Sequence, residues 1–517
     1  MASQSRDISR RPPRSLAILW TIASLIAMGL SSSCWQLNNN LEKRLVDAPA
    51  RGIEIYHGSE VAANQVLIKF SKPSGLLDRN KIFNLLEKVV GEQISISEVG
   101  VPNTYLIKAK NKDAAALISI FNALANSPEV IKLTGSRMEY VEPNHVYKLE
   151  EMPSDEFFKS QWGLKNEGLA PSKCGSELQG PILVQSVLGA DIHAQEAWDL
   201  LKNPRPIVVA VLDTGVKLNH DDLKNTIWRA PKNFDFMIGD SQINCKEGAH
   251  GFNAVTMKCD DAQIIDKTGH GTHVAGIIGA DANNGLGIAG VSPFVKIMTI
   301  KISDDQGLIF DDYIINAIKF ILKVNENSDA ADQVRVLNNS YGHTCKDINP
   351  PFCQDPPDCQ PTTLKAAMEL PGASNLLFVA SAGDDSGNNN DCNHHYPSGL
   401  DLPNVVSVAA TDNADNLAHL TNVGQKTVHI GAPGIAICSL SITNSLYEYE
   451  NGTSMSSAFV SGAAALVLSK CDQLDAKSLK DRLVRKSNVD SINMEAGKTI
   501  GGGRLNLEKA VSVQCQP

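Results

Sequence analysis

Three polar side chains stand in sequence settings that favour chemistry, namely Asp213, His270 and Ser454. Asp213 follows the apolar run 207–212, which is typical of a strand buried on both faces of a parallel sheet. His270 opens a segment rich in Gly and Ala that predicts a closely packed helix, and Ser454 precedes an Ala-rich run that predicts a second one. Each residue alone has a plainer role, as a turn former, a packing residue or a helix cap. Together, a carboxylate, an imidazole and a hydroxyl at a helix start could perform nucleophilic catalysis.

The elements that must position these groups are the ends of parallel strands and the starts of helices. A carboxylate at the carboxyl edge of a buried parallel strand lies where open α/β sheets place their sites. The second histidine, His273, lies three residues after the first, within the predicted helix, and is interpreted as a packing or hydrogen-bonding residue. A metal pair is disfavoured because no HExxH motif or third ligand accompanies the two histidines.

The order Asp, His, Ser along the chain is that of subtilisins rather than of chymotrypsin or the α/β-hydrolases. The motifs around Asp213, His270 and Ser454 resemble those of the subtilase family, and the similarity extends over about residues 155–507. The resemblance implies a doubly wound parallel α/β sheet and a serine endopeptidase that cuts polypeptides. In such an enzyme Ser454 attacks the peptide carbonyl, His270 takes its proton and returns it to the leaving amine, and Asp213 holds the imidazole tautomer.

Further segments resemble the substrate cleft of that family. Residues 337–342 resemble the strand that pairs with the substrate backbone, residues 378–383 the opposite wall of the first specificity pocket, and residues 395–398 its base. The competing interpretation is that these three segments are ordinary buried strands without a role in substrate binding. The substrate-binding residues implied by the resemblance are Ser340, Tyr341, Gly342, Ala380, Ser381, Ala382 and Gly383.

A calcium site is also implied by the resemblance. Asp222 and the loop 283–287 look like the family's strong structural calcium site, and a carboxylate, an amide and loop carbonyls are the oxygen ligands that calcium requires. Asn-Asn-Gly is a common turn as well, so a plain turn is the competing interpretation. The implied ligands are Asp222, Ala282, Asn284, Leu286 and Ile288, and no catalytic cofactor is expected.

The chain departs from the family at the oxyanion hole, which the resemblance assigns to Ser454 and residue 384. The family has an Asn at 384 whose amide donates to the oxyanion, whereas this chain has Asp384. An ionised carboxylate offers no donor, and a protonated one offers a single O–H. Certain prohormone convertases of the kexin branch also carry Asp here and are active. Two more differences follow the serine, where Ala458 replaces the usual Pro and Phe459 the usual His.

Three acidic residues at or near position 384 allow two interpretations, one of which concerns substrate selection. Asp384, Asp385 and Asp391 could select basic substrate residues, or they could be solvated acids in turns. The net charge of -10 argues against nucleic acid as a partner and provides no basic patch for an anionic membrane.

The first 34 residues predict export. Arginines precede the apolar run 16–30, which Ser31, Ser32, Ser33 and Cys34 follow, and this is the pattern of a secretory signal. A signal anchor is disfavoured because the run is short for a membrane span. Cys34 either carries a lipid anchor or leaves with the signal. The other ten cysteines suggest disulfides in an exported protein, with pairings that the sequence does not define.

Residues 35–150 are predicted to contain a linker and a small domain with its core in 61–149. Strand and helix patterns there follow the order βαββαβ of a ferredoxin-like fold. Residues 141–147 resemble the end of the inhibitory prodomain of subtilisin-like proteases, and residues 153–164 resemble the start of the mature enzyme. The resemblance implies an autoprocessed zymogen whose prodomain is an intramolecular inhibitor, cut somewhere in 148–153, with 151–517 as the catalytic domain.

The sequence therefore predicts a serine endopeptidase that is secreted or resides in the cell envelope. A hypothesis of a different class is a weakly active or inactive homologue that binds peptides or a partner protein. Asp384 favours this second hypothesis, whereas the intact Asp, His and Ser motifs and the retained prodomain oppose it. A proline-rich insert from Cys345 to Cys359 is predicted to be a disulfide-stapled surface loop near the cleft.

Overall fold

The structure is a computed structural model of the 517-residue chain. It describes residues 53–515, with gaps at 58, 72–85, 100, 135, 146–152, 170–172, 176–185, 202–203, 347–355, 357 and 492–502. The predicted signal over residues 1–34, with Cys34, and most of the predicted junction at 148–153 lie outside the described residues. Among the helices that are described, none is both long and apolar enough to cross a membrane.

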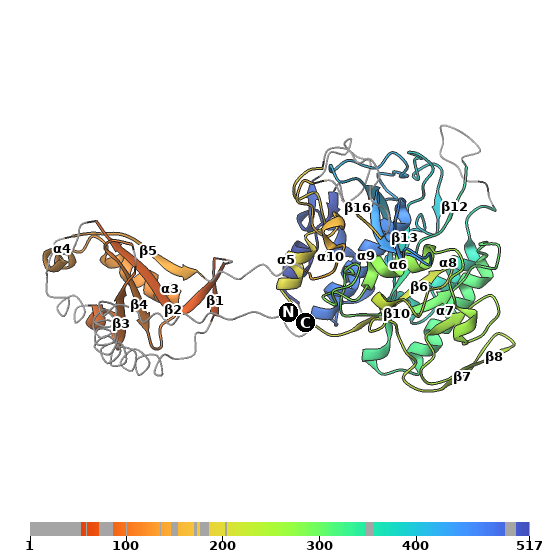
Figure 1. Ribbon diagram of the computed structural model, residues 1–517, viewed down its shortest axis with the longest axis horizontal. Helices are drawn as coiled ribbons and strands as arrows, with labels where there is room; N and C mark the ends of the chain where they lie inside the picture. The colour runs from red at the N-terminus through yellow and green to blue at the C-terminus, as the bar shows by residue number, and fades with distance from the viewer. Residues whose placement is uncertain are drawn as a thin grey trace, which may run out of the picture. The chain divides into compact units, whose positions relative to one another are not determined.

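The chain forms two compact units, Met1–Glu150 and Glu151–Pro517 (Figure 1). The first unit contains an antiparallel sheet with the strand order β3-β4-β2-β5, made of β2 (Ser59–Phe70), β3 (Ile94–Glu98), β4 (Thr104–Ala109) and β5 (Met138–His145). Helix α3 (Ala114–Leu124) buries Leu117 and Phe121 in the core of this unit. This arrangement is consistent with the predicted ferredoxin-like order.

Two elements of the first unit were not predicted. Strand β1 (Ile53–Tyr56) pairs with the first half of β2, so β2 begins six residues before the apolar run that predicted it. Helix α4 (Pro128–Thr134) follows α3. Both are short, and a four-residue strand or a seven-residue helix carries too few periods for a sequence pattern to stand out.

The second unit is built on a nine-stranded sheet in the order β19-β20-β16-β15-β13-β11-β6-β10-β9 (Figure 1). Neighbouring strands are parallel except for β19 and β20, which form an antiparallel pair at one edge. The strands are β6 (Ile207–Asp213), β9 (Gly251–Asn253), β10 (Val295–Lys301), β11 (Val334–Asn339), β13 (Leu377–Ser381), β15 (Val405–Thr411), β16 (Ile430–Pro433), β19 (Val489–Ser491) and β20 (Gly503–Leu505).

Helices cover both faces of this sheet, so its strands are buried on both sides. Successive side chains of β6 alternate between two cores, because side chains on a strand point to opposite faces. Val209 and Val211 belong to the core that contains α5 (Ala194–Asp199), α6 (His270–Gly279), α9 (Thr453–Lys470), α10 (Ala476–Val484) and α11 (Leu507–Ser512). Ala210 and Leu212 belong to the core of α7 (Asp311–Glu326) and α8 (Thr362–Met368). The predicted doubly wound α/β fold is confirmed.

Disulfides tie the second unit together. Among the described residues, disulfides join Cys174 to Cys438, Cys245 to Cys259, Cys345 to Cys359, and Cys471 to Cys515, and Cys392 is also disulfide-bonded. The first of these bonds spans 264 residues of sequence and connects the early part of the unit to β17 (Ile437–Leu440). A cross-link that closes so long a loop removes much conformational entropy from the unfolded chain.

Candidate active site

Asp213 ends the central strand β6 and is almost fully buried. Its Oδ1 accepts a hydrogen bond from the Nδ1 of His270 at 2.8 Å and a second from the backbone N–H of Thr214, also at 2.8 Å. Because an ionised carboxylate can only accept, the Nδ1 of His270 carries the proton, and its Nε2 is left free to act as a base.

His270 is the first residue of α6, and two glycines let it approach β6. A Cβ on Gly271 would lie 2.2 Å from the carbonyl oxygen of Gly215 and 3.0 Å from the Cβ of Asp213, so only glycine fits there. Gly269, which precedes the helix, has a φ of 102°, a conformation that favours glycine. The spacing of Gly-His-Gly therefore follows from the need to bring a helix start against the end of a strand.

The imidazole of His270 is about one-third exposed, and charges of opposite sign surround it. Burial alone disfavours the charged ring, but the carboxylate and hydrogen bond of Asp213, together with Glu450 and Asp266, outweigh it and raise the pKa of His270 to about 9. By contrast, His273 is fully buried, its Nε2 lies 3.1 Å from the carbonyl oxygen of Ile437, and burial lowers its pKa to about 3. This histidine packs inside the fold, as interpreted from its place in the helix.

Asp266 supports the start of α6 and was missed by sequence reasoning. Its Oδ1 accepts from the N–H of Gly269 and its Oδ2 from the N–H and hydroxyl of Thr272, at 2.7–3.0 Å. Burial would raise its pKa, but these bonds lower it overall, so the carboxylate stays ionised. Lys301, beside Asp213 in the parallel register, supplies a nearby positive charge. An Asp shortly before a helix start is a capping signal that could have identified Asp266.

Ser454 is the second residue of α9 and is held against β11. Its Oγ donates to the carbonyl oxygen of Ser340 at 3.3 Å, while the hydroxyl of Ser340 donates to the carbonyl of Ser454 at 3.0 Å. The side-chain amide of Asn338 donates to the Ser340 hydroxyl. Its oxygen accepts from the hydroxyl of Ser461, which lies about two helical turns after Ser454 in α9. This buried network fixes the start of α9 relative to the strand.

The predicted substrate-binding residues lie at the ends of two adjacent strands. β11 and β13 are parallel neighbours, with Asn339 opposite Ala380, so the segments that leave them run side by side. Ser340, Tyr341 and Gly342 follow β11, whereas Ala380 and Ser381 end β13 and Ala382 and Gly383 follow it. The structure brings both segments to Ser454, because Ser340 contacts it directly and the N–H of Gly383 donates to the hydroxyl of Thr453 at 3.1 Å.

Asp384 lies at the N-terminus of α9. Its Oδ1 accepts from the backbone N–H of Thr453 at 2.9 Å, one residue before the nucleophile candidate, and its Oδ2 would be 3.0 Å from a Cβ on Gly452. Burial raises the pKa of Asp384, and the neighbouring Asp385 raises it further, against hydrogen bonds from Thr453 and the charge of His270. The side chain keeps an exposed surface, and the pKa of its carboxyl is raised above the usual aspartate value by the part that is desolvated.

The two neighbouring acids have local partners. Asp385 accepts from the hydroxyl of Thr344 at 2.6 Å and from the amide of Asn422 at 3.1 Å. Asp391 accepts from the N–H groups of Lys426 and Thr427. Both acids therefore stabilise loops, which agrees with the interpretation as turn residues.

The predicted calcium ligands lie partly together. Oδ1 of Asp222 accepts from the amide of Asn284 at 2.6 Å, and its Oδ2 accepts from the N–H of Ile288 at 2.9 Å. Asp222 is fully buried, and burial, with the charges of Asp155 and Asp281, raises its pKa to about 7. Ala282 and Leu286 belong to the same loop, where the N–H of Leu286 binds the side chain of Asn284. The groups that contact the Asp222 carboxylate are N–H donors, so the feature that fits a hard cation here is the excess of buried negative charge.

Asp155 joins this cluster and was not among the predicted ligands. Its carboxylate accepts from the N–H groups of Asn283 and Asn284, and its charge raises the pKa of Asp222. It lies 67 residues before Asp222 in the sequence, outside any local pattern that could have indicated it.

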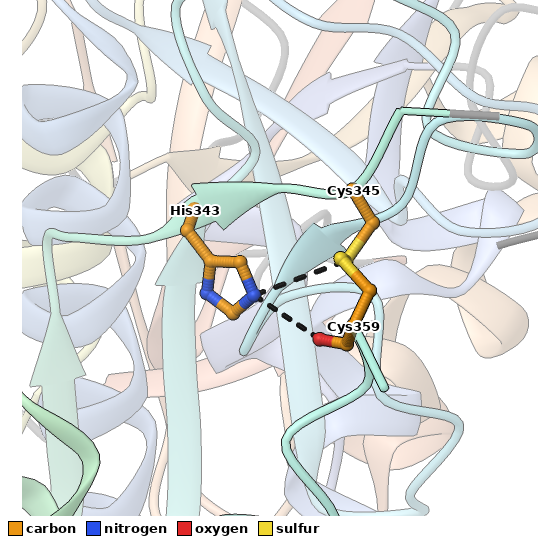
Figure 2. Close-up of side chains that lie close together, drawn as sticks. All are labelled: His343, Cys345 and Cys359. Atoms are coloured by element: carbon orange, nitrogen blue, oxygen red, sulfur yellow. Dashed lines mark hydrogen bonds between the residues drawn. A yellow bond between two sulfur atoms is a disulfide. The ribbon is translucent and has the colours of Figure 1, made fainter. Parts of the chain in front are cut away.

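A second group of ligand-type side chains, His343, Cys345 and Cys359, has no free thiolate for a metal. The two cysteines are disulfide-bonded to each other. The Nε2 of His343 lies 3.8 Å from the Sγ of Cys345 and 3.3 Å from the carbonyl oxygen of Cys359 (Figure 2). The bond joins the two ends of the predicted proline-rich insert, most of which lies outside the described residues, and His343 contacts both cysteines.

The chain is similar to known serine proteases. Residues 205–504 match the model of the subtilase family. A thermophilic serine proteinase of Bacillus sp. (strain AK1) is 29% identical over 425 residues, which cover 81% of this chain and 83% of that protein. Subtilisin DY of Bacillus licheniformis is 29% identical over 304 residues, 59% of this chain and 90% of that protein. A solved protease structure from Pseudoalteromonas arctica covers 70% of this chain and 99% of its own with a TM-score of 0.51 at 22% identity, which shows the shared fold.

The structure brings an aspartate, a histidine and the start of a serine-bearing helix to one edge of a parallel α/β sheet, and the matched relatives are named as a serine proteinase and a subtilisin. The family model covers more than half of the chain, and this chain belongs to the subtilase family of serine endopeptidases.

The hydrogen bonds of Asp266 predict a stability effect. In Asp266→Asn, an amide must replace a carboxylate that accepts from several donors, and its NH₂ group would face donors instead of accepting from them. We expect the free energy of unfolding to fall by about 1–3 kcal/mol, measured by denaturant titration. The matched control Asp260→Asn changes an exposed cap with one backbone donor, a bond that Asn can also accept, and should stay within about 0.5 kcal/mol of wild type. Equal losses in both variants would contradict the role of Asp266.

Proposed function

We propose that the chain is an exported serine endopeptidase that acts through Asp213, His270 and Ser454 and is made as an autoprocessed zymogen. The observation that carries the proposal is the 2.8 Å bond between Asp213 and the Nδ1 of His270. That bond leaves Nε2 of the imidazole as the only basic position, which is the requirement for a general base. The charge of His270 acts on Asp384, which accepts from the N–H of Thr453 at the start of α9, so the imidazole lies near the helix start that carries Ser454.

The proposed chemistry follows from these atoms. His270 Nε2 takes the proton of the Ser454 hydroxyl while the Oγ bonds to the carbonyl carbon of the substrate. The C–N bond then breaks, and the proton passes from His270 to the leaving amine. Water repeats the steps on the acyl-enzyme and releases the carboxylic acid. Asp213 holds the ring and stabilises the imidazolium throughout.

The oxyanion would form at the N-terminus of α9. The N–H of Ser454 is one donor, because the first N–H groups of a helix have no partner within the helix. Asp384 can provide the second donor only when protonated. The raised pKa of this carboxyl makes protonation easier, while the backbone N–H of Thr453 donates to its Oδ1.

Residues 35–150 are proposed to act as a prodomain that inhibits the enzyme until it is cut within 148–153. Support comes from the separate folding unit Met1–Glu150 and from its antiparallel sheet. The match to the Bacillus sp. AK1 proteinase covers 81% of the chain, more than the residues from 205 onwards contain, so it also includes part of the preceding chain.

Export to the medium or the cell envelope is proposed from the signal pattern in residues 1–34, with either a lipid anchor at Cys34 or removal of that cysteine. The disulfides support an oxidising destination, since such bonds persist outside the cytosol.

A structural calcium ion is proposed at Asp222, with Asp155, Asn284 and the carbonyl groups of the loop that contains Ala282, Leu286 and Ile288. The ion would neutralise buried carboxylates and hold this loop against the start of the catalytic unit. The raised pKa of Asp222 supports the proposal, because burial and like charges hold the carboxylate in an unfavourable state that a cation would relieve.

The alternative is a homologue that binds peptides with weak or no activity, and Asp384 is the observation that favours it. One experiment separates the two. We expect purified precursor to lose the segment before about residue 155 and then to cleave an unfolded protein substrate, and Ser454→Ala to do neither. If correctly folded material is neither processed nor active at any pH, the binding role is the better account.

The pH profile of kcat/KM tests the role of Asp384. His270 must be neutral, so activity rises with pH towards its pKa of about 9, whereas Asp384 must be protonated, so activity falls as pH rises through the pKa of its carboxyl. Wild type therefore has its optimum at lower pH than Asp384→Asn, whose amide donates at every pH. We expect Asp384→Asn to raise activity near neutral pH by about 100- to 1,000-fold, which is what the oxyanion-hole Asn contributes in subtilisin.

The control for charge is Asp240→Asn, an exposed change in the turn between β7 (Phe234–Ile238) and β8 (Ser241–Cys245). It should leave the profile unchanged. An Asp384→Asn profile that matches wild type in height and shape would remove Asp384 from the oxyanion hole.

Calcium can be tested on the Ser454→Ala protein, which cannot digest itself. Calcium at 100 times its Kd should stabilise the fold by about 2.7 kcal/mol and raise Tm, and a chelator should reverse the gain. Asp222→Asn should lose this response, while Asp221→Asn, an exposed neighbour paired with Lys224, should keep it. A calcium response that survives in Asp222→Asn would place the ion elsewhere.

A further inference from the structure

His395 occupies the space between the two segments that leave β11 and β13. A Cβ on Gly342 would lie 2.2 Å from its Nε2 and 2.8 Å from its Cδ2, and a Cβ on Gly383 would lie 2.7 Å from its Nδ1 and 2.8 Å from its Cε1. Opposite edges of one imidazole therefore contact the two segments. Both positions must be glycine for the ring to fit, and the ring spans the full distance between them.

The ring lies next to the reaction centre. Ser340, two residues before Gly342, accepts from the Ser454 hydroxyl, and Gly383 donates to Thr453. In the proposed enzyme, the residue whose carbonyl Ser454 attacks, here called P1, would place its side chain between these segments. His395, which is 7% exposed, would then form the floor of this P1 pocket.

Two further contacts lock the ring. The hydroxyl of Thr344 lies 2.9 Å from Nδ1 of His395 and 2.6 Å from the carboxylate of Asp385. The single proton of that hydroxyl goes to the carboxylate, which can only accept, so Nδ1 carries its own proton and donates to Thr344. The amide N–H of Asn422 donates to the same oxygen of Asp385, and the amide oxygen of Asn422 accepts from the backbone N–H of Asp385.

Strand pairing and burial keep the ring in place as well. Thr344 and His395 are opposite each other where β12 (His343–Thr344) pairs with β14 (His395–Tyr396). Burial, assisted by the charge of His343 and opposed by Asp385, lowers the pKa of His395 to about 4, so the ring is neutral near pH 7. The floor of the pocket is therefore a fixed, uncharged group and not a mobile side chain.

We infer that His395 makes the P1 pocket shallow, so that the endopeptidase accepts small P1 side chains and rejects large ones. The inference rests on the proposed role of Ser454 and adds a substrate class to it: peptide bonds that follow Gly, Ala or Ser. Thr344 and Asp385 act as positioning residues, since they hold the ring in the pocket without contacting the substrate themselves.

The test is a set of peptide substrates that differ only at P1, with Ala, Ser, Leu or Phe. For wild type we expect kcat/KM to be at least 10-fold higher for Ala and Ser than for Leu and Phe. In His395→Gly, the opened pocket should raise kcat/KM for Phe and Leu relative to that for Ala by about 10- to 100-fold, the range expected for burying such a side chain. Thr344→Val should give a smaller shift in the same direction.

The matched control is His394→Gly. The ring of His394 stacks on Tyr396, so side chains 394 and 396 share one face of the strand and 395 faces the other way. This variant should keep the wild-type preference.

The outcomes separate the two proposals. No Ser454-dependent cleavage of any peptide, or of an unfolded protein, overturns the proposed function. Cleavage that favours Phe or Leu in wild type overturns the role of His395 but leaves the proposed endopeptidase function intact. The same conclusion follows if His395→Gly and His394→Gly change the P1 preference equally. Should His395→Gly not fold, the wild-type order of P1 residues still decides.

Discussion

The active site depends on the burial of helix α9. Of the residues from Thr453 to Lys470, all except Ser454 and Lys470 are buried. A helix that is apolar on every side can lie only inside a protein, between the sheet and the outer helices. Its axis is therefore set by the packing of the whole catalytic unit, and its first turn carries Ser454 to a defined point. Ala458, which stands in place of the family's Pro, lies within this unbroken helix and keeps a backbone N–H there.

The polar groups around that point are fixed by contacts that replace water. Asp213 and Asp266 are buried carboxylates, which would be costly without donors. Both oxygens of Asp266 accept from N–H or hydroxyl groups, whereas only Oδ1 of Asp213 has hydrogen-bond partners among the described residues, and the charge of Lys301 lies nearby. The same contacts position His270, because its N-terminal neighbour Gly269 and its own Nδ1 bind to these two acids. Stability and chemistry thus rest on one set of hydrogen bonds, and the raised pKa of His270 is a consequence of the negative charges that hold it.

Much of the fold and part of the site could be predicted because they leave local patterns. The run 207–212 has the continuous apolar character of a strand covered on both faces, and the structure buries it there. Gly271 follows His270 because the start of the helix contacts the end of β6 and leaves no room for a Cβ, so the sequence motif reflects a close contact in the fold. Strand β1 and helix α4 escaped prediction because they are too short to show a period.

The sequence by itself determined the class of fold, the family motifs, and the identity of the aspartate, histidine and serine that the site brings to one edge. The tertiary structure alone decided which distant acids are partners of which groups: Asp155 beside Asp222, and Asp385 joined through Thr344 to His395. The physical reason is that a motif reports contacts between near neighbours in the chain. Hydrogen bonds between residues dozens of positions apart depend on how the strands and loops pack, and no local pattern in the sequence encodes them.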